Sequence, residues 1–229
     1  MTLLNKPLPT NAYFSTDRVR EGALIHFTAG PTAVSAFQTF YSSPKRLGYP
    51  VSVPYIVDAT GDVWQLYPDT KTGYHIGVVD STFAQNHNHD WRLIGIEVAN
   101  IGPLTVGHDG VTLTWMNGQI VYGRLGDPHC PPVVKLPTPY RGITYFAAYP
   151  QVQIDATIQL VDSLQKAHGF PRVIPPAAHR FAFDPTYFAT YKGVCSHVNF
   201  VDNWKWDQAP MHSDAIWNGL KALGFTEAS

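Results

Sequence analysis

His197, Lys205 and Asp207 lie close together near the end of this chain of 229 residues. The histidine and the aspartate are ten positions apart (207 − 197), and the lysine comes two positions before the aspartate. Imidazole and carboxylate groups are common zinc ligands, and a fixed positive charge beside them can stabilise the oxyanion that a metal hydrolase forms. The segment therefore predicts part of a hydrolytic metal site, provided that the chain supplies a third ligand.

His26 is the best candidate for that third ligand. It lies in the apolar run 23–28, which ends before Gly30 and Pro31 and predicts a buried strand. A single histidine in a strand is more often a core residue than a ligand, but the functional sites of α/β proteins gather at strand ends. Two histidines and one carboxylate leave the fourth zinc position open to water, as in catalytic rather than structural zinc sites.

Glu97 is the one charged residue in the apolar run 93–99. A carboxylate inside a buried strand is costly unless it is paired or faces a site. Two interpretations follow: an edge strand with Glu97 in solvent, or a general base whose pKa is raised by burial. Lys205 is either an ordinary surface lysine or the group that stabilises an oxyanion, and Trp206 either excludes water, packs in the core or stacks on a sugar.

The elements that must position these residues alternate between strands and helices. Strands are expected at 23–28, 51–59, 63–67, 93–99 and 179–183, with a hairpin turn at 60–62. Helices are expected at 31–42, with Val34, Phe37, Phe40 and Tyr41 on one face, at 151–168 and at 213–223. This order predicts an α/β fold with a mixed central β-sheet flanked by helices.

Residues 104–149 differ from the rest, and we interpret them as an insertion into a single domain that spans 1–229. Two β-rich runs flank Met116-Asn117-Gly118, which predicts a hairpin with an Asn-Gly turn. A proline-rich loop is expected at 127–139. The sequence assigns no role to this insertion.

Composition excludes several classes of protein. A hydrophobic share of 45% is typical of a globular chain, and a net charge of −1 leaves no basic surface for nucleic acid. No apolar run approaches the ~20 residues of a membrane span, and no secretory leader is seen, so we expect a soluble monomer without membrane insertion. The sequence leaves open whether its two cysteines, Cys130 and Cys195, pair.

Taken in order, these motifs resemble the zinc-dependent N-acetylmuramoyl-L-alanine amidases of the peptidoglycan-recognition-protein, or amidase type 2, family. The resemblance runs from about residue 23 to residue 210, apart from the insertion, and rests on segments 25–30, 51–63, 73–77, 94–97 and 197–207. The chain departs from the family pattern at Pro54, where many relatives have histidine, and in the loop 198–203, which lacks the usual proline–glycine pattern.

The resemblance implies a role for each candidate residue. His26, His197 and Asp207 would bind Zn²⁺, with Glu97 as the base and Lys205 as the oxyanion-stabilising group. The substrate would contact three further residues: Tyr55, His75 and Trp206.

The reaction implied by the resemblance is hydrolysis of the amide between N-acetylmuramic acid and L-alanine, with peptidoglycan or a muropeptide as the partner. Because all three ligand positions are filled, an active enzyme is favoured over a non-catalytic peptidoglycan-binding receptor. Three settings share this chemistry: a bacteriolytic phage endolysin, a cytoplasmic amidase that recycles anhydro-muropeptides, and an exported antibacterial toxin. We favour the endolysin, made in the cytoplasm and acting on the cell wall after holin-type release or dedicated export.

Overall fold

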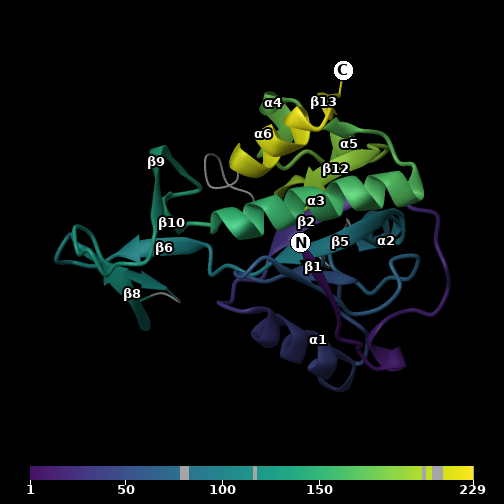
Figure 1. Cartoon of the computed structure of the whole chain (residues 1–229), viewed down its shortest axis with the longest axis horizontal. Coiled ribbons are helices and arrows are strands. Elements are labelled where there is room, and N and C mark those ends of the chain that lie inside the picture. The colour runs from purple at the N-terminus through teal and green to yellow at the C-terminus, as the bar shows by residue number, and fades with distance from the viewer. Residues whose placement is uncertain (78–82, 116–117, 203–204, 208–213, 229) are drawn as a thin grey trace.

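The computed structural model describes residues 1–229 except 78–82, 116–117, 203–204, 208–213 and 229 (Figure 1). Its centre is a six-stranded mixed sheet in the order β1-β4-β3-β5-β2-β12. These strands are β1 (Thr2–Asn5), β4 (Asp62–Gln65), β3 (Tyr55–Val57), β5 (Leu93–Val98), β2 (Gly22–Phe27) and β12 (Gly193–Ser196). Helices flank this sheet, so the predicted fold class is confirmed.

The middle of the sheet is parallel, and its register brings the candidate residues together. β2 pairs in parallel with β5 on one side and with β12 on the other, and His26 lies directly opposite Glu97. The apolar runs that predicted β2 and β5 are buried almost throughout, as expected of strands covered on both faces. The predicted hairpin is also confirmed, because β3 and β4 pair in antiparallel fashion across the 58–61 turn.

Helices cover both faces of the sheet. Leu160 of α3 (Gln151–His168) and Trp217 of α6 (Asp214–Ala222) join one core cluster with Ile25 and Ile96. On the other face, Phe40 of α1 (Ala33–Leu47) packs in a second cluster against β3 and β4. Since side chains alternate along a strand, His26 and Glu97 face away from α3 and α6. Figure 1 shows α3 crossing the sheet, with α1 well separated from it.

The predicted helix 151–168 is confirmed at both ends, and it stops at Gly169, whose φ is 68°. The predicted helix 31–42 forms as α1, which begins at Ala33 and extends to Leu47. Its predicted apolar face is correct for Phe40, which is buried, and for Phe37, which packs against the same cluster, but wrong for Val34 and Tyr41. Val34 is 50% exposed and Tyr41 60% exposed, whereas the small Ala33 and Ala36 are buried with Phe40.

Several short elements complete the chain. The prediction of a strand at 179–183 is wrong, because the helix α4 (Ala177–Arg180) covers the start of this segment. Other described elements around the central sheet are the 3₁₀ turns η1 (Thr10–Ala12) and η3 (His197–Asn199), the helices α2 (Phe83–Arg92) and α5 (Pro185–Phe188), and the strands β11 (Val173–Ile174) and β13 (Thr226–Glu227).

A second sheet of five antiparallel strands lies to one side of the central sheet, at the left of Figure 1. Its order is β8-β7-β6-β10-β9, from β6 (Pro103–Val106), β7 (Thr112–Trp115), β8 (Ile120–Arg124), β9 (Val133–Tyr140) and β10 (Ile143–Ala147). The antiparallel pairing of β7 with β8 agrees with the predicted hairpin, although Met116 and Asn117 of its turn lie outside the described residues.

The loop expected at 127–139 is only partly a loop, because β9 begins at Val133. Pro137 and Pro139 are tolerated there since β9 is an edge strand, where a missing N–H need not break the ladder. Cys130 and Cys195 are both free thiols, so the disulfide left open by the sequence does not form. Among the described residues, no helix combines the length and the apolar character that crossing a membrane requires.

Candidate metal centre and catalytic site

The three predicted metal ligands converge at the carboxyl end of two neighbouring strands. His26 lies near the end of β2, and His197 directly follows β12, which pairs with β2 in parallel. Their Nδ1 atoms are 2.8 Å apart, and one ligand atom from each of His26, His197 and Asp207 lies within 4.8 Å of the others. All three residues are at least 97% buried, at exposures of 1%, 3% and 1%.

Asp207 is held in place through its backbone and one carboxylate oxygen. The backbone N–H of Phe27 donates to its Oδ1 at 3.0 Å, and the hydroxyl of Ser196 donates to its carbonyl oxygen at 3.1 Å. The other oxygen, Oδ2, is buried and has no hydrogen-bond partner among the described residues. A buried carboxylate oxygen without a partner is costly, and a bound cation would remove that cost.

The histidines are also in the state that a metal ligand needs. Burial lowers the pKa of His26 and of His197, so both imidazoles are neutral near pH 7. The Nε2 of His197 lies 2.7 Å from the carbonyl oxygen of Ile76, which can only accept a hydrogen bond. The proton of His197 is therefore on Nε2, and the lone pair on Nδ1 points at the candidate centre. Two neutral imidazoles and one carboxylate fit zinc.

His75 lies behind the predicted ligands rather than at a substrate surface. Its side chain is 2% exposed, and its Nδ1 is 3.0 Å from the Nε2 of His26. The backbone N–H groups of His75 and Ile76 donate to Oδ1 of Asp90, each at 2.9 Å. The enclosed ring of His75 faces His26, so this geometry favours a role in orienting His26, and the substrate contact stays a prediction.

Tyr55 also lies elsewhere than expected. It packs in the core cluster that contains Leu160 of α3, on the face of the sheet opposite Glu97. Its hydroxyl donates to Oδ2 of Asp69 at 2.9 Å. Strand alternation points the ring of Tyr55 to the face opposite His26 and Glu97. The predicted substrate contact stays a prediction that this packing does not support.

Trp206 packs against a small apolar cluster of the second sheet that contains Leu136 and Phe146. Its indole Nε1 is buried and has no hydrogen-bond partner among the residues that the structure describes. Of the alternatives raised by the sequence, packing is the one that these contacts support.

Glu97 lies beside the predicted ligands with its carboxyl group enclosed. Its Oε2 is buried and unpartnered within the described part of the chain, although the residue as a whole is partly exposed. Burial raises the pKa of Glu97 to about 8; the charge of Asp207 adds to this shift, and that of Lys205 opposes it. A carboxyl group with this pKa can both take and release a proton near neutral pH.

The charge of Lys205 acts on every group of this site, lowering the pKa of His26, of His197 and of Asp207. Its backbone carbonyl accepts a hydrogen bond from Nη1 of Arg141 at 2.7 Å. Lys205 is therefore close enough to the centre for its ammonium group to interact with a negative charge that forms there.

Sequence patterns did not single out Asp90, Arg141 or Trp115, which the structure places around the site. Trp115 lines a cavity of about 310 Å³ together with Glu97 and Pro31. Asp90 supports the backbone beside His75, and Arg141 supports that of Lys205. No local motif marks such residues, because each acts through a segment distant in the sequence.

A family model described as N-acetylmuramoyl-L-alanine amidase matches residues 16–210. No curated protein is similar enough in sequence to count as a match. Among solved structures, a mutant endolysin from Bacillus subtilis is similar with a TM-score of 0.50 and 15% identity, over 97% of this chain and 98% of that one. The structure of PlyL is similar with a TM-score of 0.50 and 10% identity, over 96% and 94% of the two chains. At these identities the similarity concerns the fold.

Proposed function

Because the chain belongs to the N-acetylmuramoyl-L-alanine amidase family, we propose that it is a zinc-dependent hydrolase that cuts the amide between N-acetylmuramic acid and L-alanine in bacterial peptidoglycan. One observation carries this proposal beyond the family: His26, His197 and Asp207 converge within 4.8 Å. The buried carboxyl group of Glu97 lies on the neighbouring strand, opposite His26.

Each residue of the site has a proposed part in the reaction. His26, His197 and Asp207 would hold zinc, which would supply Lewis-acid chemistry towards the amide carbonyl and the attacking water. Glu97 accepts the proton of the attacking water and returns it to the leaving amine of L-alanine. The ammonium group of Lys205 stabilises the oxyanion, and His75 orients the ring of His26 through their contact at 3.0 Å.

The decisive test combines metal analysis with the products of digestion. Purified peptidoglycan should release stem peptides with a free amino group on L-alanine, identified by mass spectrometry. A chelator should abolish this release, and zinc should restore it. A protein that binds peptidoglycan, contains no zinc and releases no amino groups would instead be a receptor without catalysis.

For the biological setting, we propose a phage endolysin that acts on the cell wall. The fold similarity to a Bacillus subtilis endolysin is compatible with this setting but concerns the fold alone. Hydrolysis of intact cell walls supports the endolysin, whereas a requirement for anhydro-muropeptides would indicate a recycling amidase.

A further inference from the structure

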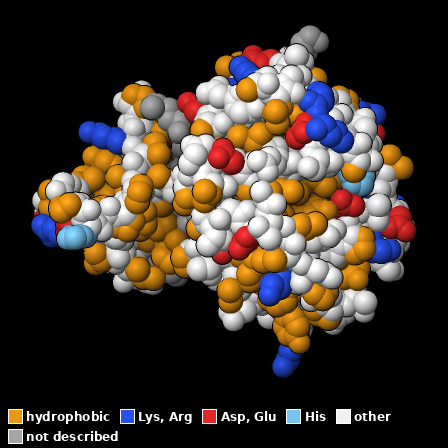
Figure 2. Space-filling view, in the orientation of Figure 1, with side chains coloured by type: hydrophobic (Ala, Val, Ile, Leu, Met, Phe, Trp, Pro, Cys, Tyr) orange, Lys and Arg blue, Asp and Glu red, His pale blue; other side chains and the backbone are white. Residues whose placement is uncertain are grey.

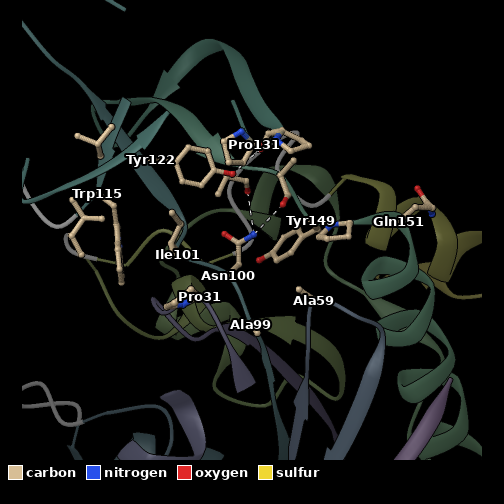
Figure 3. Close-up of a pocket in the computed structure, with 16 residues that line it drawn as sticks. Pro31, Ala59, Ala99, Asn100, Ile101, Trp115, Tyr122, Pro131, Tyr149 and Gln151 are labelled. Atoms are coloured by element: carbon tan, nitrogen blue, oxygen red, sulfur yellow. Dashed lines mark hydrogen bonds between the residues drawn. The ribbon is translucent and has the colours of Figure 1, made fainter. Parts of the chain in front are cut away.

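The described part of the chain encloses a large apolar cavity (Figure 3). It has a volume of about 760 Å³ and lies between the ends of the central strands and the second sheet. Ala59 and Ala99 line it on the side of the central sheet, and Trp115 and Tyr122 line it on the side of the second sheet. Its volume is typical of ligand pockets, which occupy roughly 300–1,000 Å³.

This apolar cavity adjoins the place where the amide would be cut. Pro31 and Trp115 line both the apolar cavity and the smaller cavity that contains Glu97. A substrate that reaches Glu97 therefore has only to extend past these two side chains to enter the apolar cavity. Because that part of the substrate is tethered, weak contacts in the cavity suffice to hold it.

The lining does not suit a charged ligand. None of the described residues that line the apolar cavity is Asp, Glu, Lys, Arg or His. The amide of Asn100 donates to the carbonyl of Ala147 at 3.2 Å and accepts from the N–H of Gly102 at 2.6 Å, and the hydroxyl of Tyr122 donates to the carbonyl of Pro132 at 3.0 Å. A stem peptide would lose the hydration of its carboxylates here without gaining a partner.

A neutral sugar ring can lie here with one face on the apolar lining and its hydroxyl groups towards solvent, because the lining residues Ile120 and Val121 are exposed. The C–H faces of a pyranose pack well on aromatic side chains, and an N-acetyl methyl group adds apolar surface. Trp115 and Tyr122 come from the paired strands β7 and β8 and offer two rings to such a ligand. Figure 2 shows hydrophobic side chains gathered over the second sheet, and the exposed Ile120 and Val121 of β8 also line the cavity.

We propose that the apolar cavity is a subsite for an N-acetylated sugar ring of the glycan strand, next to the muramic acid whose amide is cut. This inference rests on the proposed amidase function. It gives the second sheet a part in substrate choice, favouring glycan strands of several sugars over single-sugar fragments.

Comparing two substrates distinguishes a defect in this subsite from a defect in the hydrolytic centre. The first is an N-acetylmuramoyl peptide with one sugar, and the second is the same peptide on a chain of four sugars. Tyr122→Ala should lower kcat/KM about tenfold on the four-sugar substrate, mainly through KM, and less than twofold on the one-sugar substrate. Val121→Asp should show the same selectivity, because Val121 is 66% exposed and can carry a charge at the cavity without disturbing the core.

Tyr145→Ala is the matched control, since Tyr145 belongs to the same sheet but does not line the apolar cavity. It should leave the ratio of the two kcat/KM values unchanged. An equal loss on both substrates in Tyr122→Ala and Val121→Asp, or no loss, would overturn the subsite and leave the amidase function standing. A wild-type protein that hydrolyses neither substrate would overturn the amidase function instead.

Measuring the binding of a sugar tests the subsite independently of hydrolysis. Tri-N-acetylchitotriose should change the tryptophan fluorescence of the wild-type protein, and Tyr122→Ala should weaken its binding about tenfold. The sugar assignment would be contradicted if the protein does not bind this sugar but binds a prenyl lipid or an apolar peptide, and if Tyr122→Ala weakens that binding.

Discussion

At the scale of single residues, the carboxyl group of Glu97 has surroundings unlike those of a surface acid. It lies inside a strand, and its Oε2 has no hydrogen bond to any described residue. Burial raises its pKa to about 8. Nothing in the packing of β5 requires an acid at this position, which supports a chemical role.

Glu97→Gln keeps the shape of the side chain and removes its ability to exchange a proton. We expect peptidoglycan hydrolysis to fall about 10²–10⁴-fold, with the zinc content per chain unchanged. Turnover and metal content should be measured on the same preparation. Glu21→Gln is the control, because Glu21 pairs with Arg92 and Lys192 before the start of β2 and should not affect turnover. Full activity in Glu97→Gln would remove the proposed base.

Asp90 is a second buried acid, and its titration should affect stability. Burial raises its pKa to about 7, whereas hydrogen bonds from the N–H groups of His75 and Ile76 oppose the shift. Since the pKa is about 4 in the unfolded chain, the folded protein binds this proton more tightly. The contribution of Asp90 to stability is therefore complete below pH 4 and is lost as the pH rises to about 7.

Asp90→Asn removes this titration. The free energy of unfolding of the variant, measured relative to wild type by urea denaturation, should increase from pH 4 to pH 7 and then level off. Asp155→Asn, at an exposed position of α3, is the control. Its free energy of unfolding relative to wild type should not rise between pH 4 and pH 7. If the free energy of unfolding of Asp90→Asn relative to wild type also stays constant between pH 4 and pH 7, the raised pKa of Asp90 is contradicted.

At the scale of elements, the hairpin of β9 and β10 supports the segment that carries Asp207. Nη1 of Arg141, in the turn of this hairpin, donates to the carbonyl of Lys205 at 2.7 Å. Trp206 packs on the Leu136 cluster of the same hairpin. The second sheet therefore positions a predicted metal ligand as well as lining the apolar cavity.

Arg141→Gly separates this support from general stability. Arg141 has a φ of 49°, which glycine adopts without strain, so the substitution should not lower the melting temperature by much. A hydrogen bond from a charged group contributes about 1.5–3 kcal/mol, so its loss should weaken zinc binding about tenfold or more. Competition with a chelator measures this affinity. Arg124→Gly, at an exposed position of β8, is the control and should bind zinc like wild type.

At the scale of the whole molecule, the predicted ligands connect parts of the chain that are far apart in sequence. His26 belongs to β2, whereas His197 and Asp207 come from the region after β12, more than 150 residues later. A metal held by all three would stabilise the folded state over the unfolded chain, because the unfolded chain does not present the ligands together.

Zinc should therefore raise the melting temperature of the metal-free protein in a saturable way. At a zinc concentration about 100-fold above Kd, the gain is about 2.7 kcal/mol. His197→Ala should remove most of this gain, whereas His179→Ala, outside the predicted ligand set, should retain it. Calorimetry with and without zinc measures both, and an equal response in the two variants would argue against this ligand set.

Local patterns in the sequence were sufficient for β2, β5, α3 and α6, because apolar periodicity and terminal signals depend on neighbouring residues. Residue type and spacing, together with the family resemblance, selected His26, His197 and Asp207, which the structure brings together. They did not predict β9, because an edge position that tolerates proline is a property of the assembled sheet.

By itself, then, the sequence determined the main strands and helices and the chemistry of the candidate ligands. Only the tertiary structure decided that Tyr55 faces α3, that His75 lies behind His26, and that Trp115 joins the cavity of Glu97. The physical reason is that the direction of a side chain depends on which elements pack against its strand, and those elements come from distant parts of the chain.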